Sequence, residues 1–446
     1  MLRESESLGR RLFHKTMQEK KNREGIIALV QKEVVPAIGC TEPMAVALCT
    51  SKAATVLGRR PERIEVLLSP NMLKNAMGVG IPGTGMIGLP IAVSLGALIG
   101  KPKYELEVLK DLTPETLEKG KRYIQDADID IKLKNGNVDK LYIEVICHVG
   151  KDSSTAIISG SHTNFVFVER NGEVVLDKQN DAQAGDAANE DIQLNFQMVY
   201  DFATTAPLDE ISFILKTKEY NMKAAELSIK GNYGHCLGKT MDRPLSHGIF
   251  GNSIFSHIIS RTASACDARM GGAMIPVMSN SGSGNQGICA TNPVSVYALE
   301  NENTEEELVR ALMLSHLTAI YIKQSLGKLS ALCGCVVASI GSSCGITYLM
   351  GGDYQQVCNS VKNMVANLTG MICDGAKPSC ALKISSGVST ALLSSLLSME
   401  GKCVTSAEGI VDDNVDKCIH NLTSIGADAM RATDDMVLDI MTHKTC

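Results

Sequence analysis

The chain has 446 residues, which at roughly 150 residues per domain predicts two or three domains. Apolar residues make up 44% and charged residues 21%, values that exclude a disordered, collagen-like or coiled-coil chain and indicate a globular protein. The formal net charge is −6. Because a domain dedicated to nucleic acid usually carries a basic face, we expect no nucleic-acid partner.

The first 25 residues are polar and charged and contain no apolar stretch of the signal-peptide type. We therefore expect a cytoplasmic protein. Its 15 cysteines should then be thiols rather than a disulfide framework. Most of them should be small buried hydrophobes, and some could be metal ligands.

An uncharged stretch over residues 75–100 resembles a membrane span in composition, but it contains seven glycines and two prolines. Such breakers would leave backbone groups unpaired in lipid, so we expect no membrane span and instead a glycine-rich loop before a buried helix over residues 91–99. Within this loop, Gly83-Thr-Gly85-Met-Ile-Gly88 fits the dinucleotide fingerprint. That fingerprint requires a strand directly before it, and the strand-like run over residues 63–68 ends too early.

From residue 103 to about 180 the pattern alternates with a period of two. Ile129, Ile131 and Leu133 alternate with charged residues, and after an Asn-Gly turn a second alternating run follows over residues 141–145. Further short runs cover residues 155–159, 165–168 and 174–176. Alternation broken by Asn-Gly turns predicts antiparallel hairpins. A helix should begin at Pro114 with Thr113 as its cap.

After residue 185 the pattern is helical. Thr304 and Glu307 form a capping box for a helix that can run to Leu326. Further helices are predicted over residues 354–368 and 436–441, and small residues indicate closely packed helices over 331–346 and 384–400. The predicted fold class is therefore α+β. A mostly helical core should be built from residues 1–102 and 186–446, with a small α+β domain containing an antiparallel sheet inserted at 103–185.

Three cysteines could form an iron–sulfur site. Cys373 and Cys380 flank a loop that contains glycine and proline, and Cys333 lies forty residues before Cys373. Loop thiolates beside helix ends suit an iron–sulfur cluster, because backbone N–H groups stabilise the charge on sulfur. Three ligands would leave one iron open as a Lewis acid. Buried structural cysteine is the alternative.

Three polar segments could bind or act on a substrate. Cys40, in Gly39-Cys40-Thr41-Glu42-Pro43, precedes a predicted helix start, where a thiol should have a depressed pKa and could serve as a base or nucleophile. The loop over residues 279–287 offers many N–H, hydroxyl and amide donors for an anion, although it could be only a linker. His162 lies in a predicted turn, where it could contact a substrate or be structural.

Together these motifs resemble the L-cysteine desulfidases, which are related to the alpha chain of iron–sulfur-dependent bacterial L-serine dehydratases. The resemblance extends over residues 25–442. It implies a [4Fe-4S] cluster on Cys333, Cys373 and Cys380, Cys40 as the base, and conversion of L-cysteine to pyruvate, ammonia and hydrogen sulfide. The substrate-binding residues that we expect are Thr41, Glu42, His162, Thr163, Asn164, Ser281, Gly282, Ser283, Gly284, Asn285 and Gln286.

Several alternatives stay open. Cys289, Cys335 and Cys344 lie near the cysteine trio in sequence and could replace one of its members, and the C-terminal Cys446 could reach the open iron. A serine dehydratase, or another dehydratase of β-substituted amino acids, would use the same parts. A non-enzymatic iron–sulfur ligand sensor and a dinucleotide oxidoreductase are the other classes. The expected partner is a small amino acid, and a homodimer is a candidate assembly.

Overall fold

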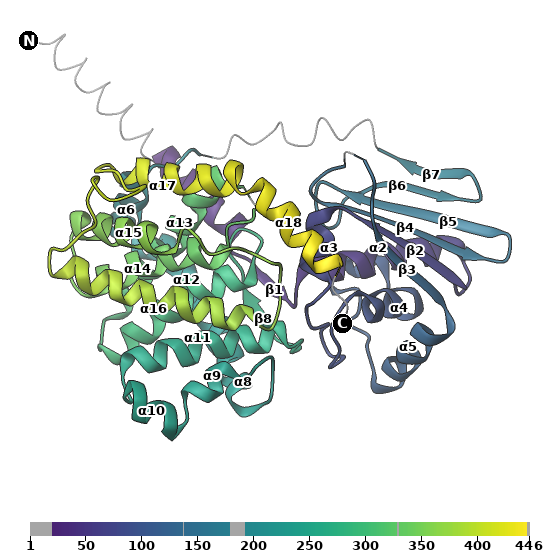
Figure 1. The fold of residues 1–446 in the computed structure, drawn as a ribbon, viewed down its shortest axis with the longest axis horizontal. Helices are drawn as coiled ribbons and strands as arrows, with labels where there is room; N and C mark the ends of the chain where they lie inside the picture. The colour runs from purple at the N-terminus through teal and green to yellow at the C-terminus, as the bar shows by residue number, and fades with distance from the viewer. Residues whose placement is uncertain (1–19, 137, 179–191, 328–329, 444–446) are drawn as a thin grey trace, which may run out of the picture.

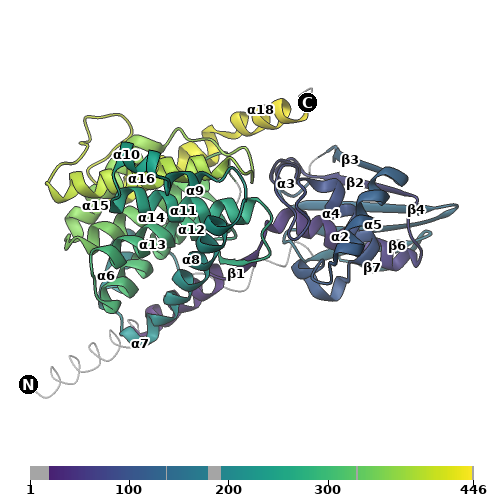
Figure 2. The same ribbon diagram turned by 90° about the horizontal axis from the view of Figure 1, so that it is seen from below.

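The computed structural model describes residues 20–136, 138–178, 192–327 and 330–443. It has two lobes that lie side by side (Figures 1 and 2), one mostly helical and one built on a sheet. The α+β class and the predominance of helix are therefore confirmed.

The helical lobe is formed by a helix over residues 20–33, a two-stranded antiparallel ribbon and the C-terminal half of the chain. The ribbon consists of β1 (Pro36–Ile38) and β8 (Pro276–Met278). The helices are α6 (Phe196–Thr205), α7 (Leu208–Ile211), η3 (Ser212–Ile214), α8 (Leu215–Lys230), α9 (Leu237–Met241), α10 (Pro244–Phe250), α11 (Ile254–Met270), α12 (Gly284–Glu300), α13 (Glu305–Leu326), α14 (Gly334–Leu349), α15 (Tyr354–Leu368), α16 (Cys380–Met399), α17 (Val415–Ser424), η4 (Ile425–Ala429) and α18 (Arg431–Thr442).

Helix α14 lies at the centre of this lobe and packs against α12, α13, α15 and α16. Small residues allow its neighbours to approach closely. At Gly341 an added Cβ would lie 2.3 Å from the backbone oxygen of Ser315. The first small-residue segment therefore leads into a buried helix, α14, as the sequence predicts, whereas α16, which covers the second segment, is only partly buried.

The second lobe is a six-stranded sheet in the order β3-β2-β4-β5-β6-β7, with helices packed on it. The strands are β2 (Arg63–Leu68), β3 (Asp128–Leu133), β4 (Tyr142–Val149), β5 (Asp152–Ser159), β6 (Phe165–Arg170) and β7 (Glu173–Asp177). The helices are α2 (Thr41–Leu57), α3 (Pro70–Ala76), α4 (Leu89–Ile99), η1 (Pro102–Glu107) and α5 (Pro114–Asp126). Helix α2 packs directly on β4 and β5, and α4 and α5 follow as an outer layer (Figure 1).

The predicted hairpin between residues 129–133 and 141–145 is wrong, because β2 lies between these two strands. β2 pairs in parallel with β3 and antiparallel with β4. The apolar side chains of Ile64, Val66 and Leu68 are fully buried, whereas β3 carries alternating charges suited to a sheet edge. Because β2 and α2 belong to this lobe, the lobe begins well before the predicted boundary at residue 103.

Helix positions predicted from local signals are confirmed. Helix α5 begins at Pro114 with a capping box at Thr113, and α13 begins after Thr304 and ends before Gly327. The glycine-rich stretch is followed by a buried helix, α4. Within the described ranges one helix, α16, is long and apolar enough to cross a membrane, and half of its most apolar stretch is buried inside the protein.

The lobes are joined by the C-terminal helix as well as by the chain before α2. Helix α18 leaves the helical lobe and runs to α3 of the other lobe (Figure 1). There Asp434 forms an ion pair with the buried Lys74. Leu438 joins the hydrophobic core of the sheet lobe. This contact holds the two lobes around the site described next.

Candidate functional site

The three predicted cluster cysteines come from three segments of the helical lobe. Cys333 is the residue before α14, Cys373 lies in the loop between α15 and α16, and Cys380 is the first residue of α16. Two short extended segments run antiparallel, because the Cys333 N–H donates to the oxygen of Met371 at 3.0 Å and the Cys373 N–H donates to that of Ala331 at 2.7 Å. Backbone pairing thus sets Cys333 beside Cys373.

Side-chain interactions link the same three thiols. Cys373 interacts electrostatically with both Cys333 and Cys380. The loop curls back on itself, since the Lys377 N–H donates to the Cys380 sulfur at 3.4 Å. Three thiols that are forty and seven residues apart therefore lie together between the starts of α14 and α16.

Other cysteines surround the trio. The Cys333 and Cys335 sulfurs are 3.3 Å apart, and Cys289 interacts electrostatically with both Cys333 and Cys380. No sequence motif marks Cys266. Burial raises the pKa of its thiol, and the nearby Cys380 raises it further. Cys344 has other neighbours, among them Thr318 and Ser360, and Cys446 lies outside the described residues.

The thiols of this site suit the cluster that the family resemblance implies better than a single metal ion. No three His, Cys, Asp or Glu residues within the described segments converge as ligands of a single metal ion. A four-iron cluster is larger, and its ligands surround it rather than meet at one point. Thiols are its usual ligands, and Lys377 and Lys383 lie within electrostatic range of the trio to offset negative charge. The chemistry of the donors therefore fits an iron–sulfur cluster.

The predicted donor loop lies beside this trio. Ser283 caps α12 by accepting a hydrogen bond from the Gln286 N–H, and Ser281 takes the left-handed conformation with φ of 48°. The Gln286 side chain packs on Gly334, where an added Cβ would lie 2.9 Å from its carboxamide carbon. Gly334 directly follows Cys333, so the loop and the cysteine trio share a boundary. The Oε1 atom of Gln286 is buried without a hydrogen-bond partner.

The ribbon brings Cys40 to the same place. Pairing of β1 with β8 is extended by two hydrogen bonds, from the Ser279 N–H to the oxygen of Val35 at 2.8 Å and from the Ser281 N–H to that of Glu33 at 2.9 Å. The chain then passes Gly39 and reaches Cys40, the residue before α2. Lys377 interacts electrostatically with Cys40 as well as with Cys373 and Cys380.

The expected low pKa of Cys40 is wrong. Burial raises the pKa of this thiol well above its ordinary value, and the Glu42 carboxylate raises it further. The Cys40 side chain is 2% exposed, and its Sγ–H donates to Glu42 Oε2 at 2.7 Å. Desolvation and a neighbouring negative charge both favour the neutral thiol, and here they outweigh the helix N-terminus. The thiol is therefore protonated at neutral pH.

Glu42 stays ionised despite its surroundings. Burial raises its pKa, but the charge of His162, the hydrogen bond from Cys40 and the charge of Arg269 together lower it below the ordinary value. The hydroxyl of Thr41 also donates to Glu42 Oε2, at 3.1 Å. Residues 40–42 thus form a connected thiol, hydroxyl and carboxylate group at the start of α2.

The turn between β5 and β6 brings His162 close to the site, where its charge lowers the pKa of Glu42. Its neighbour Thr163 lies in the same turn, whereas Asn164 closes the turn, since its side-chain amide donates to the oxygen of Ser159 at 2.9 Å. The structure therefore places His162 near the site, as the sequence predicts, whereas Asn164 makes a structural contact within the turn.

The glycine fingerprint lacks the strand–turn–helix geometry of a dinucleotide site. Helix α3 and a turn separate β2 from α4, and Gly83, Gly85 and Gly88 take positive φ values within that turn. Pro82 instead packs against Gly39, where an added Cβ would lie 2.4 Å from its ring. The segment therefore supports the entry to α2.

Sequence reasoning missed Arg269. This residue lies in the last turn of α11 and is 4% exposed, and its guanidinium donates to Asn285 Oδ1 at 3.0 Å. It carries no recognisable motif, and only the packing of α11 against α12 brings it to the donor loop.

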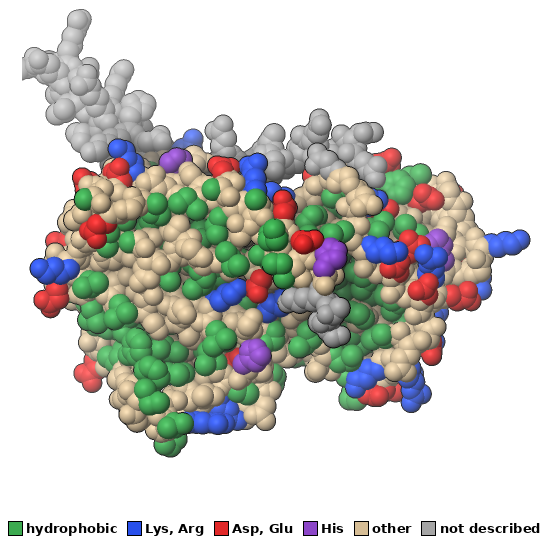
Figure 3. Space-filling view, viewed as in Figure 1, with side chains coloured by type: hydrophobic (Ala, Val, Ile, Leu, Met, Phe, Trp, Pro, Cys, Tyr) green, Lys and Arg blue, Asp and Glu red, His purple; other side chains and the backbone are tan. Residues whose placement is uncertain are grey.

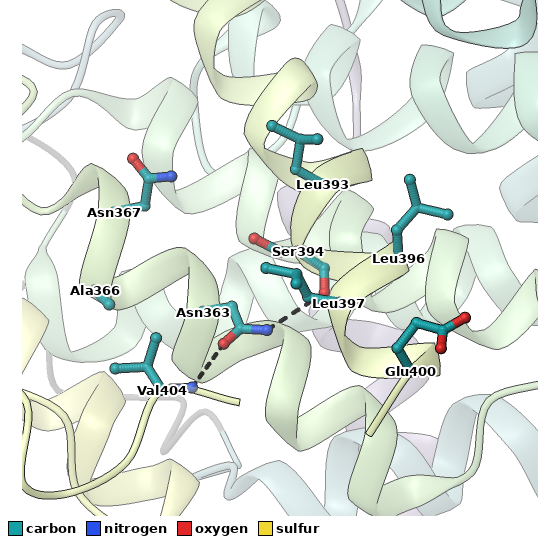
Figure 4. A pocket seen from close by; sticks show the side chains of 9 residues that line it. All are labelled: Asn363, Ala366, Asn367, Leu393, Ser394, Leu396, Leu397, Glu400 and Val404. Carbon is teal, nitrogen blue, oxygen red and sulfur yellow. Dashed lines mark hydrogen bonds between the residues drawn. The ribbon is translucent and has the colours of Figure 1, made fainter. Parts of the chain in front are cut away.

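Two surface features lie apart from this site. A groove of about 570 Å³ between α15 and α16 is lined by Leu393, Leu397 and Asn363 (Figure 4). Leu393 is 13 residues after Cys380 on α16, roughly 20 Å along the helix, so the groove does not reach the trio. Hydrophobic side chains also gather over α10 and α16 (Figure 3). The exposed ones are Leu245, Ile249, Phe250, Leu382, Leu393, Leu396 and Leu397.

The comparisons with known proteins show the family to which the chain belongs. Residues 103–439 match the family described as serine dehydratase alpha chain, a family of lyases that generally depend on an iron–sulfur cluster. The chain belongs to this family, and the predicted resemblance is confirmed at that level. It is 65% identical over 427 residues to a "UPF0597 protein" of Bacteroides thetaiotaomicron, covering 95% of this chain and 99% of the relative. It is 54% identical over 431 residues to one of Porphyromonas gingivalis, covering 96% and 100%.

Proposed function

We propose that the protein is a lyase that eliminates sulfide from L-cysteine to give pyruvate and ammonia, with a [4Fe-4S] cluster on Cys333, Cys373 and Cys380. The observation that carries the proposal is the meeting of this trio with Cys40 and the donor loop. These parts come from distant positions in the chain, and a small substrate could contact all of them at once.

When bound, such a cluster would supply a Lewis acid at the iron that has no protein ligand, and sulfur is a soft ligand suited to it. The donor loop would bind the substrate carboxylate, because its N–H and amide groups lie at the N-terminus of α12. Cys40 would remove the proton from the α-carbon. Cleavage of the bond between the β-carbon and sulfur then releases sulfide and leaves aminoacrylate, which tautomerises and hydrolyses to pyruvate and ammonia.

Cys40 must lose its own proton before it can act as the base. The acceptor within reach is Glu42, which is 2.7 Å from the thiol and is ionised in the resting site. Cys40 and Glu42 would therefore work as a pair, and Arg269 would favour the thiolate through its positive charge.

L-Serine is the second candidate substrate, and the family description favours it. The same base and carboxylate site would serve, with hydroxide rather than sulfide as the leaving group. The two reactions differ in the leaving group that the iron without a protein ligand would accept, so a direct comparison of the two substrates decides between them.

The deciding experiment is anaerobic purification, a count of iron and sulfide per chain, and a pyruvate assay with L-cysteine and L-serine side by side. We expect about four irons and pyruvate formation that is faster with L-cysteine. Faster turnover of L-serine would reassign the substrate. A loaded cluster without turnover of any β-substituted amino acid would instead support a ligand sensor.

The proposal extends to the cellular setting. The described cysteines are free thiols, as expected of a reducing cytoplasm. The amino acid would be the only small-molecule partner, with neither nucleic acid nor membrane involved. The exposed apolar side chains of α10 and α16 would support a homodimer. Analytical ultracentrifugation of the loaded protein tests the assembly.

A further inference from the structure

Arg269 is a buried cation with very few partners. Its side chain is 4% exposed, and its Nε atom is buried without a hydrogen-bond partner. It forms no ion pair with a carboxylate of the described residues, and its one hydrogen bond among them is to the neutral Asn285. A buried charge is costly unless it is paired and hydrogen-bonded. The Glu42 carboxylate feels the charge of Arg269 without a hydrogen bond to it, so the guanidinium keeps hydrogen-bonding capacity for an anion from outside the chain.

The position of Arg269 strengthens this argument. Its guanidinium packs against Gly284, the first residue of α12, where an added Cβ would lie 2.3 Å from the Nε atom of Arg269. A helix N-terminus is itself electropositive and normally attracts acidic rather than basic side chains. An anion bound between the Arg269 guanidinium and the start of α12 would therefore be stabilised by both.

The anion would sit within reach of the reacting groups. Asn285 and Ser283 belong to the donor loop, and the charge of Arg269 acts on both Cys40 and Glu42 across the site. Arginine is the side chain best suited to a carboxylate, because its planar fork can donate two parallel hydrogen bonds. Glycine at 284 is required to leave room for that fork.

We propose that Arg269, together with the first N–H groups of α12, binds the α-carboxylate of the amino-acid substrate and so fixes its α-carbon beside Cys40. Asn285 holds the guanidinium in place through its Oδ1 atom, 3.0 Å from the Arg269 terminal nitrogen. The identity of the reacting amino acid rests on the proposed function, whereas the requirement for a carboxylate does not.

The test uses the full chain, purified anaerobically, and measures binding by calorimetry with two probes that cannot react. L-Alanine carries the α-carboxylate without a leaving group, and ethylamine is the same molecule without the carboxylate. Wild-type protein should bind L-alanine more tightly. Arg269→Met should weaken L-alanine binding by about 10- to 100-fold, as expected for loss of a charged hydrogen bond, and should leave ethylamine binding unchanged.

Controls separate recognition from folding. Arg261→Met makes the same change on the same helix at a partly exposed position and should alter neither binding curve. Arg269→Lys keeps the charge, should keep the thermal unfolding transition, and should restore only part of the affinity. Equal binding of both probes by the wild type, or L-alanine binding unaffected in Arg269→Met, would overturn the proposal. Loss of folding in both Arg269 variants would also overturn it, by showing a structural role.

The two proposals can fail independently. If wild-type protein makes no pyruvate from L-cysteine or L-serine but L-alanine binding still depends on Arg269, the carboxylate site stands and the proposed reaction falls. If pyruvate is formed and the KM of Arg269→Met equals that of the wild type, the reaction stands and the assignment of Arg269 falls.

Discussion

At the scale of single residues, the chemistry of Cys40 is set by its neighbours rather than by its place before a helix. The sequence correctly predicts the helix start, yet the pKa moves in the opposite direction, because burial and Glu42 are stronger influences. Neither can be inferred from the motif alone, since the burial of Cys40 depends on how the two lobes meet.

Replacing Cys40 with Ala should leave the iron content intact and lower turnover by about 10²- to 10⁴-fold, the usual effect of a missing general base. Cys40→Ser should be nearly as damaging, because a hydroxyl is far less acidic than a thiol. Iron analysis and pyruvate assays check both. Cys49→Ala is the matched control, since this buried thiol on the same helix hydrogen-bonds to the oxygen of Ala156. Loss of iron from Cys40→Ala would make Cys40 a ligand instead.

The effect of Glu42 on Cys40 predicts the direction of a pH shift. The carboxylate disfavours the thiolate and raises the pKa of Cys40, so Glu42→Gln should lower that pKa. Alkylation of Cys40 by iodoacetamide, followed by mass spectrometry across pH, should then begin at lower pH in the variant than in the wild type. Thr41→Val removes another contact of the same carboxylate without changing charge, and should leave the alkylation profile in place. A rise in the pKa of Cys40 in Glu42→Gln would contradict the conclusion that the Glu42 carboxylate disfavours the thiolate.

At the scale of helices and strands, local signals predict boundaries and fail on pairing. The capping boxes at Thr113 and Thr304 fix helix starts because they satisfy N–H groups within one turn. The order of strands depends instead on which strand the tertiary packing buries, and β2 has Ile64, Val66 and Leu68 fully buried on one face. β2 therefore takes the place beside β4 that a local hairpin would have given to β3.

The close packing of α14 predicts a strong effect of a single methyl group. Gly341→Ala would place a Cβ 2.3 Å from the oxygen of Ser315, so the helices must separate, and overpacking of this kind costs about 1–3 kcal/mol. Chemical denaturation should show the corresponding loss in the free energy of unfolding. Gly370→Ala is the control, because nothing lies within 4 Å of a Cβ there, and it should have little effect. Equal stability of the two variants would mean that α14 is less tightly packed than described.

At the scale of the whole molecule, the site is shared between the lobes. Cys40 and Glu42 begin the first helix of the sheet lobe, while the trio, the donor loop and Arg269 belong to the helical lobe. The spacing and residue types of the sequence mark the trio and the loop as candidates, and the fold brings them close together. The sequence could not predict Arg269 or the nearby Cys266, because both reach the site only through the packing of α11 against α12 and α16.

The ion pair between Lys74 and Asp434 holds the lobes together at the end of α18, and it should therefore affect the site. The Lys74 side chain is 3% exposed, and Asp434→Asn would leave its charge without a partner. Breaking a largely buried ion pair in this way costs about 3 kcal/mol. The backbone oxygen of Lys74 also accepts a hydrogen bond at 2.9 Å from Lys377 of the cluster loop. We thus expect Asp434→Asn to lower both the free energy of unfolding and the iron retained after purification. Asp111→Asn disrupts the exposed pair with Lys101 in the same lobe, and its stability and iron content should match the wild type. Full iron retention in a destabilised Asp434→Asn protein would show that the docking of α18 and the cluster loop are independent.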